Sequence, residues 1–509
     1  MRKSYKLLII SILAVLLLTA CSSKSAEKEG NGEKEINLLF NFAANSLDPN
    51  IDTSYVSLRA GITETLVHLN DENLMIEPWL AESWSSEDGQ TWTIKLRNDV
   101  TFQNGEPMDG EAVKASLERA MKDSIAIENA LRIESIRAVG HTLTIKTEVP
   151  FPEFPSELVH PNTSIIDVTE TDFVNKPIGT GPFAVSSFTP GTAVDLMRYE
   201  GYWDGAAKLE KARFSFNEDA NARSLALESG GADIVFRPEV ESLENLEAIE
   251  GVAVESTSTF RVHQMTMNLQ RESMRNINVR KAIDALIDRK SIVDTILRGH
   301  AAVADGPFPS SFSFAPTYPE KQTGIEVART FLEQAGYEEV GGVMQKDGEP
   351  LALTLLTYSA RADLPLIAQV FQSDAGQLGI EVDIQQIEVP EEYMAANRDW
   401  DLTTYSNLTA PRGDAGYYLN ATYHPNGALN FSGVNDSKLT GMIDQLNSTV
   451  GQEGRSDLAE EIAGYVDKEV YNSFILHPNT LVAYNSDKVE NWVTSRSEYY
   501  MLTNVLDVK

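Results

Sequence analysis

The sequence predicts a soluble α/β protein built from two or more lobes. Segments in which apolar residues alternate, as in strands, are interleaved with segments in which they recur at helical spacing. About 475 residues follow position 35, more than a single hydrophobic core usually accommodates. The composition, 42% hydrophobic and 23% charged, is ordinary for a globular protein. Folded structure is therefore expected from about residue 36 onward.

Individual elements follow from this periodicity. Strands are expected at 35–42, 90–97 and 141–149, and Asp88-Gly89 is expected to form the turn before the second of them. Helices are expected at 110–124, 278–297, 324–337 and 457–470, the third of them stopped by Gly336. The segment 364–389 is expected to form a helix, a glycine-containing turn and a strand. This interleaved order is the basis of the α/β prediction.

The chain begins with an export signal rather than with the fold. A positively charged start precedes an apolar run at 7–18, which is shorter than the ~20 helical residues needed to span a bilayer. Leu18-Thr19-Ala20-Cys21 resembles a bacterial lipobox, which implies a signal peptide at 1–20, cleavage before Cys21 and lipidation of its sulfur. An ordinary secretory signal is the alternative. Cys21 is the only cysteine, so an intrachain disulfide is excluded. Residues 21–35 are small, polar and charged, and are expected to be a flexible tether.

Charge and motifs narrow the class of function. The formal net charge of −33 argues against nucleic acid and against direct binding to an anionic lipid surface. It suits a cationic ligand and equally suits solubility alone. The sequence contains no GxSxG, HExxH, Walker A or CxxC motif. Residues 179–184 fit GxGxxA, but Pro177 and Pro182 flank the glycines and a strand-like run follows, which argues against a nucleotide site. We expect a binding protein, not an enzyme, without a catalytic cofactor.

Five blocks of sequence, in order, resemble those of one family. The segment AESWSSEDGQTWTIKLRNDVTFQNGEP resembles the signature of the extracellular solute-binding proteins of ABC importers for dipeptides, oligopeptides and nickel. Four further blocks are similar to other segments of that family, and they occur at 177–183, 199–205, 222–234 and 279–292. A lipobox is what the family uses where no outer membrane retains a soluble binding protein. The resemblance therefore implies a lipid-anchored binding protein on the outer face of the cytoplasmic membrane, partnered by an ABC permease.

The resemblance also implies a two-lobed periplasmic-binding-protein-like fold. The family has an enlarged N-terminal lobe, two chain crossovers and a ligand cleft at the hinge. On this sequence, lobe I is expected to comprise residues 36–267 and a C-terminal return at 481–509, and lobe II residues 268–480. The crossovers are expected near 265–270 and 477–482. A monomer is expected.

One loop separates the two ligand chemistries of the family. Peptide-binding members commonly hold the peptide ammonium with an Asp in a loop resembling G-D-x-x-D-P. In the matching stretch TAPRGDAGYYL, Asp414 matches the second acid and Pro411 replaces the first. A buried ammonium without its carboxylate costs several kcal/mol. The A-P-x-x-D form resembles the nickel-binding members, so nickel is favoured over a peptide.

Imidazole nitrogen suits nickel, and the chain has seven histidines. His477, near the second crossover, is the first candidate metal ligand. His424 is the second, because nickel-binding relatives carry a histidine in this variable loop. His263, ahead of the first crossover, is the third, and His160 is a candidate for contact with the rest of the ligand. A lone histidine in an apolar strand is more often a satisfied core residue, and this alternative stays open for each.

A small chelator is expected to complete the metal shell, because one or two imidazoles cannot supply four to six donors. Free histidine or a metallophore would serve. The chelator's carboxylates are expected to bind a cationic side chain, and Arg412 is the candidate. Tyr55 is a further ligand-binding candidate. The enterobacterial-type nickel protein has an Arg-Pro pair where Asn162 stands here, so the chelator must be held differently.

The sequence thus predicts a lipid-anchored binding protein that captures nickel, as a chelate, by lobe closure and delivers it to a permease. The nearest alternative is the same fold binding a di- or oligopeptide or an opine-like amino-acid derivative. A zinc hydrolase is disfavoured by the missing zinc motif, and a purely structural lipoprotein is disfavoured by the hinge and binding blocks.

Overall fold

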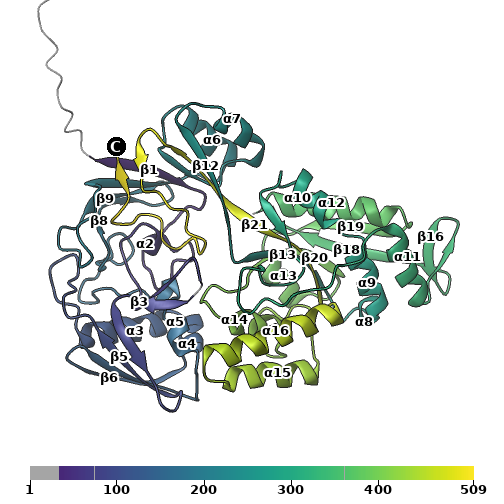
Figure 1. Ribbon diagram of the computed structural model, residues 1–509, viewed down its shortest axis with the longest axis horizontal. Helices are drawn as coiled ribbons and strands as arrows, with labels where there is room; N and C mark the ends of the chain where they lie inside the picture. The colour runs from purple at the N-terminus through teal and green to yellow at the C-terminus, as the bar shows by residue number, and fades with distance from the viewer. Residues whose placement is uncertain (1–33, 74, 360) are drawn as a thin grey trace, which may run out of the picture.

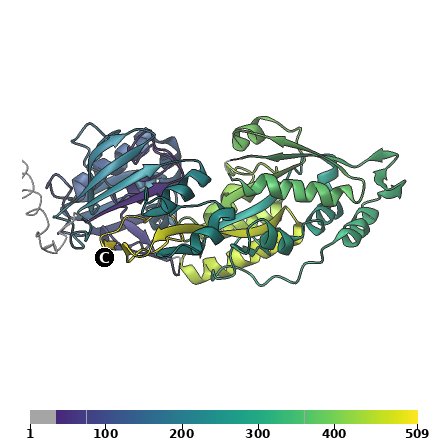
Figure 2. The same cartoon turned by 90° about the horizontal axis from the view of Figure 1, so that it is seen from above.

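The computed structural model describes residues 34–509 with the exception of positions 74 and 360. The predicted signal peptide, Cys21 and most of the tether lie outside the described residues. Two lobes lie side by side along the long axis of the molecule (Figures 1 and 2). The prediction of a two-lobed α/β protein is confirmed.

One sheet runs through both lobes and carries the hinge. Within the described residues it has 12 strands, and its main path is β19-β18-β20-β13-β21-β11-β1-β10-β9-β8. Strands β12 and β14 each pair with β21. The lobe I strands are β1 (Glu35–Phe40), β8 (Phe183–Thr189), β9 (Ala193–Arg198), β10 (Lys211–Phe216), β11 (Ile234–Phe236) and β12 (Val252–Ser258). The lobe II strands are β13 (Arg261–Met267), β14 (Ala301–Val303), β18 (Ala352–Thr357), β19 (Glu381–Gln386) and β20 (Leu402–Leu408).

Strand β21 (Asn472–Asn485) belongs to both lobes, as Figure 1 shows. Residues 472–476 pair with β13 of lobe II, whereas residues 479–485 pair with β12 of lobe I. The chain first crosses between the lobes at 259–260, between β12 and β13, and crosses back at 477–478. Because β13 pairs with β20 along its whole length, we place the first boundary at 259–260, ahead of the sequence-based boundary at 267.

Lobe I is enlarged by a second, four-stranded sheet. Its order is β4-β5-β7-β6, with bounds β4 (Ala81–Ser85), β5 (Thr91–Leu96), β6 (Ile133–Val139) and β7 (Thr142–Thr147). Helix α3 (Gly110–Asp123) begins at Asp109, whose side chain accepts a hydrogen bond from the Ala112 amide, and buries Val113 and Leu117. Short elements follow it: α4 (Ile125–Leu131), α5 (Phe154–Glu157) and the 3₁₀ turn η1 (Pro161–Thr163). They bring this subdomain to the edge of lobe I that faces lobe II (Figure 1).

Helices of lobe II form two groups. The first covers the sheet with α9 (Ile277–Ala285), α10 (Arg289–Thr295), α11 (Ile325–Gln334) and α12 (Asp363–Gly376), and shares one apolar core with β18 and β20. The second comprises α14 (Gly416–Tyr423), α15 (Ser437–Ser448) and α16 (Gln452–Glu469), and packs in the same apolar cluster as the lobe I subdomain. This second group therefore forms the lobe II side of the contact between lobes.

The remaining elements are short. They are α2 (Val56–Arg59), β2 (Val67–Leu69), β3 (Ile76–Pro78), α6 (Ala220–Glu228), η2 (Val240–Ser242), α7 (Leu243–Glu247), α8 (Glu272–Arg275), β15 (Glu338–Val340), β16 (Val343–Lys346), β17 (Glu349–Pro350), α13 (Pro390–Ala396), β22 (Val489–Glu490) and β23 (Asp507–Val508). None of the helices in the described part of the chain is both long enough and apolar enough to cross a membrane.

The structure differs from one predicted helix, and it explains the glycines of the GxGxxA match. The helix predicted at 278–297 is wrong as a single element: it is broken at 286–288, where Asp288 accepts a hydrogen bond from the Ser291 amide and starts α10. The glycines of the GxGxxA match allow the chain to pack closely against the backbone of residues 61 and 62. A Cβ on Gly179 would lie 2.2 Å from the Ile62 carbonyl oxygen, and one on Gly181 would lie 2.3 Å from that of Gly61. Strand β8 follows, where a dinucleotide site would require a helix.

Candidate functional site

A cavity of about 1510 Å³ lies between the lobes, and we call it the interlobe cavity. Its lobe I wall comes from the loop before α2, from α4 and α5, and from η1. Its lobe II wall comes from the loop between β20 and α14, from α14, and from the end of α15. Figure 1 shows these elements facing each other below the hinge. The volume exceeds the ~300–1,000 Å³ that is usual for small-molecule sites.

Two rings define the lobe I wall. Tyr55 precedes α2 in the left-handed conformation, with φ of 53°, and its ring meets that of His160 edge-on at 5.8 Å. His160 Nδ1 accepts a hydrogen bond of 3.1 Å from the Asn162 amide, which puts the proton of the neutral ring on Nε2. Burial, with a smaller effect of Arg412, lowers the pKa of His160 to about 3. His160 is therefore a neutral donor in the cavity wall.

Arg412 dominates the opposite wall. It lies in the loop between β20 and α14, and its Nη1 forms an ion pair with the Glu157 carboxylate of lobe I. The guanidinium carbon lies 4.5 Å from the centre of the Tyr417 ring. Although burial opposes it, the Glu157 carboxylate raises the pKa of the Arg412 guanidinium. The buried Nε of Arg412 has no hydrogen-bond acceptor among the described residues. The side chain thus joins the lobes and keeps one donor without a partner.

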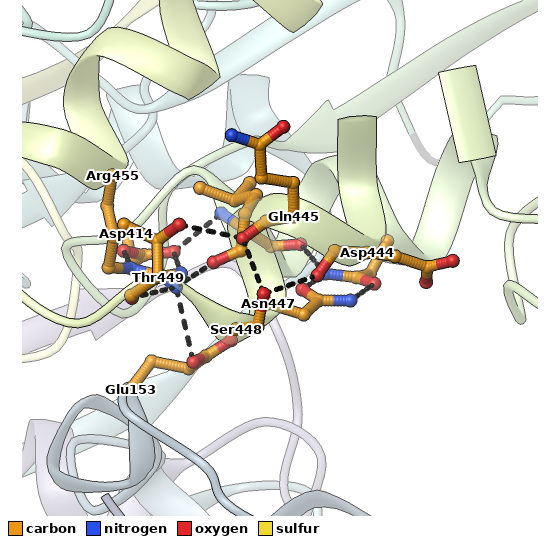
Figure 3. A network of polar contacts seen from close by, with 11 residues as sticks. Glu153, Asp414, Asp444, Gln445, Asn447, Ser448, Thr449 and Arg455 are labelled. Atoms are coloured by element: carbon orange, nitrogen blue, oxygen red, sulfur yellow. Dashed lines mark hydrogen bonds and ion pairs between the residues drawn. The ribbon is translucent and has the colours of Figure 1, made fainter. Parts of the chain in front are cut away.

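A second ion-pair network crosses the lobes beside it (Figure 3). Arg455 of α16 binds Asp414 through two hydrogen bonds, Nε to Oδ2 at 2.9 Å and Nη2 to Oδ1 at 2.7 Å. Its Nη1 lies 3.3 Å from Oε2 of Glu153, at the start of α5 in lobe I. Burial raises the pKa of Glu153 to about 7 although Arg455 opposes this. Asp414 is therefore already occupied by a bidentate partner.

His424 also lines the interlobe cavity, at the end of α14. Its Nδ1 accepts a hydrogen bond of 3.2 Å from the Asn426 amide, so the neutral ring carries its proton on Nε2. That nitrogen lies 3.5 Å from Oδ1 of Asp444. In both histidines of this cavity the neutral ring therefore carries an N–H group, and not a lone pair, at Nε2.

A second cavity of about 740 Å³ is bounded by the hinge itself, and we call it the hinge cavity. Its lining includes His263, whose Nε2 lies 2.8 Å from Oδ2 of Asp363. The other ring nitrogen, Nδ1, is buried and has no partner among the described residues. Four arginines also line it: Arg223, Arg237, Arg261 and Arg361. His263 thus lines a different cavity from His424.

His477 lines neither of the two cavities. It is 5% exposed in the middle of β21, where it pairs with Ala302 of β14. Its Nδ1 donates a hydrogen bond of 3.0 Å to the Arg261 carbonyl oxygen. Burial lowers the pKa of His477 to about 4. These contacts are those of a satisfied core histidine at the hinge.

The structure brings together most of the residues chosen from the sequence. Five of them line the interlobe cavity: Tyr55, His160, Arg412, Asp414 and His424. Pro411 is buried in the same loop as Arg412. Of the three candidate metal ligands, His263 and His477 lie on the paired strands β13 and β21, where His263 opposite Leu476 is a neighbour of His477, whereas His424 lies in the interlobe cavity. Among residues 34–509, positions 74 and 360 excepted, no group of three or more His, Cys, Asp or Glu side chains gathers as for a metal ion.

Sequence reasoning missed the carboxylates of lobe I. Glu153 and Glu157 stand four residues apart in the apolar segment FPEFPSELVH; Glu153 caps the start of the short helix α5 and Glu157 is its last residue. Arg455 was also missed, because it lies in the polar first turn of a helix where a charge is usually solvated. Two acids at this spacing within an apolar run were the available signal.

Comparisons with known proteins agree with this architecture. The model of the bacterial extracellular solute-binding proteins, family 5, matches residues 75–430. A nickel-binding protein NikA of Staphylococcus aureus is 34% identical over 499 residues, which cover 98% of each chain. A glutathione-binding protein GsiB of Escherichia coli is 29% identical over 330 residues, which cover 62% of this chain and 64% of that protein.

Solved structures show the same fold. One described as a nickel ABC transporter from Bacillus halodurans has a TM-score of 0.83 and 66% identity, and the match covers 94% of this chain and all of that one. NikA from Staphylococcus aureus in complex with Ni(L-His)2 has a TM-score of 0.80 and 33% identity, again with 94% of this chain and all of that one covered. The five sequence blocks, the two-lobed fold and these matches lead to one conclusion: the chain belongs to family 5 of the bacterial extracellular solute-binding proteins.

Proposed function

We propose that this protein binds nickel as a complex with a small chelator, in the interlobe cavity, and delivers it to an ABC permease. The NikA relative, matched over nearly its full length, and the two nickel-related structures support the metal. Because one of these holds Ni(L-His)2, a chelator with amine and carboxylate groups is supported as well. The family consists of substrate-binding transport proteins, which supports capture and release as the activity.

The chemistry of the cavity wall carries the proposal. Nε2–H of His160 and Nε2–H of His424 are donors, and a chelate coated with carboxylate oxygens accepts from such groups. The Arg412 guanidinium lines the same cavity. Tyr55 and Tyr417 add flat apolar surface to opposite walls. His424 stands near the end of its helix and is the candidate for direct ligation, which would require its ring to turn and expose a nitrogen lone pair. The metal's other donors come from the chelator.

The same wall disfavours the alternative ligand. A peptide ammonium needs a free carboxylate, and Asp414, the acid that matches the peptide-binding pattern, is held by two hydrogen bonds from Arg455. Breaking that arrangement would leave Arg455 without its best partner. The match to a glutathione-binding protein keeps a peptide-like ligand as the second candidate.

Native mass spectrometry of protein purified without added ligand tests the function. A mass increment of nickel plus a chelator, lost on acid treatment, is the expected result, because protons compete for the chelator's donor atoms. A dipeptide or tripeptide increment without metal would instead establish the second candidate.

Anchoring is a separate part of the proposal. The lipobox and Cys21 support attachment to the outer face of the cytoplasmic membrane through acyl chains, with the tether as spacer. Replacing Cys21 by Ala is expected to release a protein that folds and binds normally, since folded structure begins near residue 35. Cell fractionation with a binding assay on the medium measures this. A variant that stays on the membrane as firmly as the wild type would refute the anchor.

A further inference from the structure

Arg412, expected to clamp the chelator's carboxylates, already has a counter-ion. Its guanidinium pairs with Glu157 from the opposite lobe, and the two side chains are only 10% and 8% exposed. A buried pair of this kind carries no net charge, although its remaining donors can still form hydrogen bonds. The clamp can therefore orient an oxygen atom without supplying the positive charge that would attract an anion.

The other charges of the cavity do not restore a positive field. Its charged lining consists of two arginines and five carboxylates: Arg132, Arg412, Asp123, Glu153, Glu157, Asp414 and Asp444. Arg455, behind this wall, is shared between Asp414 and Glu153. Asp123 lies 3.2 Å from Arg119. Arg119 also pairs with Asp48, whereas Arg132 has no ion-pair partner among the described residues. Four arginines thus face six carboxylates, so the cavity has no net positive charge to balance an added anion.

We propose that the interlobe cavity selects metal chelates whose net charge is zero or positive, and that Glu157 sets this selectivity by neutralising Arg412. The inference rests on the proposed function and specifies its substrate class. A divalent metal bound by two amino acids, each through an amine and a deprotonated carboxylate, is neutral and carries oxygens that can accept hydrogen bonds from the cavity wall. Complexes of the same metal with polycarboxylates such as EDTA are anionic, and burying them beside these acids is unfavourable.

The experiment compares two preformed nickel complexes by calorimetry on the wild-type protein and two variants. Nickel bis-histidine is the neutral probe, and nickel–EDTA is the anionic probe of comparable coordination. Wild type is expected to bind the anionic probe at least about tenfold more weakly, which corresponds to about 1.4 kcal/mol. Glu157→Gln keeps an oxygen beside Arg412 but removes the counter-charge. It is expected to shift the preference toward nickel–EDTA by at least about tenfold.

Asp444→Asn is the matched control, because it removes one negative charge from the same cavity without releasing an arginine. A shift below about threefold is expected for it. Thermal melting of Glu157→Gln provides a second readout: the anionic probe should raise its melting temperature more than that of wild type, since it replaces the missing counter-ion.

The possible results separate this inference from the function on which it rests. Equal shifts in the two variants, or a wild type that binds both probes equally well, would overturn the role of Glu157 while leaving nickel-chelate binding intact. Binding of neither probe by folded wild-type protein would overturn both.

Discussion

The two cavities beside the hinge differ in the ion-pair partners of Arg412 and Arg361. In the interlobe cavity, Arg412 is paired with an acid from the opposite lobe, and Arg455, behind the wall, reaches both Asp414 and lobe I. In the hinge cavity, Arg361 forms no hydrogen bond or ion pair through its side chain with any described residue. Burial, together with Arg261 and Arg237, lowers its pKa to about 9. The ion pairs that hold the lobes together are thus concentrated at the interlobe cavity.

The comparison shows why a count of charges is a poor guide to a binding site. Both cavities contain histidine, arginine and carboxylate, yet in one of them Arg412 and Arg455 pair with acids of the opposite lobe. Bringing the lobes together therefore completes the wall that we propose to contact the ligand. Ligand binding and lobe closure are coupled through the same side chains.

The largest expected effect comes from breaking one of these pairs. Arg412→Ala leaves Glu157 buried without a counter-ion, and the free energy of unfolding should fall by about 3–5 kcal/mol. Arg361→Ala removes a buried guanidinium that has no ion-pair partner and lies near two other arginines, so it should leave the free energy of unfolding unchanged or raise it. Urea unfolding of both variants measures the difference. Equal losses of unfolding free energy in the two variants would contradict this difference between the cavities.

His477, in the hinge strand between the cavities, should behave as a core residue. His477→Ala is expected to lower the free energy of unfolding by about 1–3 kcal/mol, through loss of the hydrogen bond to Arg261, with nickel-chelate affinity unchanged. The pKa of His477 is about 4 in the folded protein and 6.5 ordinarily. Between these values the unfolded chain binds more protons, so the stabilisation is full above pH 6.5 and is lost as the pH falls toward 4.

The measurement is the stability difference between wild type and His477→Ala across this pH range, with calorimetric binding on the same samples. The difference should shrink on acidification. If affinity falls while stability holds, His477 is a metal ligand, as the sequence first suggested.

A smaller effect distinguishes the histidines of the two cavities. His424→Ala should weaken nickel-chelate binding about fivefold to tenfold, equivalent to one lost hydrogen bond. His263→Ala should leave affinity unchanged and reduce stability instead, because Asp363 loses its partner at 2.8 Å. Calorimetry measures the affinity of both variants, and melting curves measure their stability. Loss of affinity in His263→Ala but not in His424→Ala would indicate that the ligand binds in the hinge cavity.

The fold was predictable because its signals are local or belong to a long resemblance. Strands β1, β5 and β7 and helices α3, α11 and α12 follow from periodicity within single segments. The break before α10 was missed because the apolar spacing continues across Asp288, and only the capping bond reveals it.

The site was less predictable, because side-chain direction in a strand depends on pairing. Residues of a strand alternate between its two faces, and β13 and β21 change register between His263 and Gln264. Proximity of His477 to a crossover therefore could not tell which way its ring points. The loop of Arg412 and Asp414 was identified from its motif, whereas its partners Glu153, Glu157 and Arg455 depend on contacts made across long sequence separations.

The central claim is that a nickel chelate occupies the interlobe cavity. Crystals of the protein grown with nickel and L-histidine, measured at the nickel absorption edge, test it most directly. We predict one anomalous peak in the interlobe cavity between Tyr55 and Arg412, surrounded by density for the chelator. A peak beside His263 in the hinge cavity, or peptide density without metal between the lobes, would contradict the account.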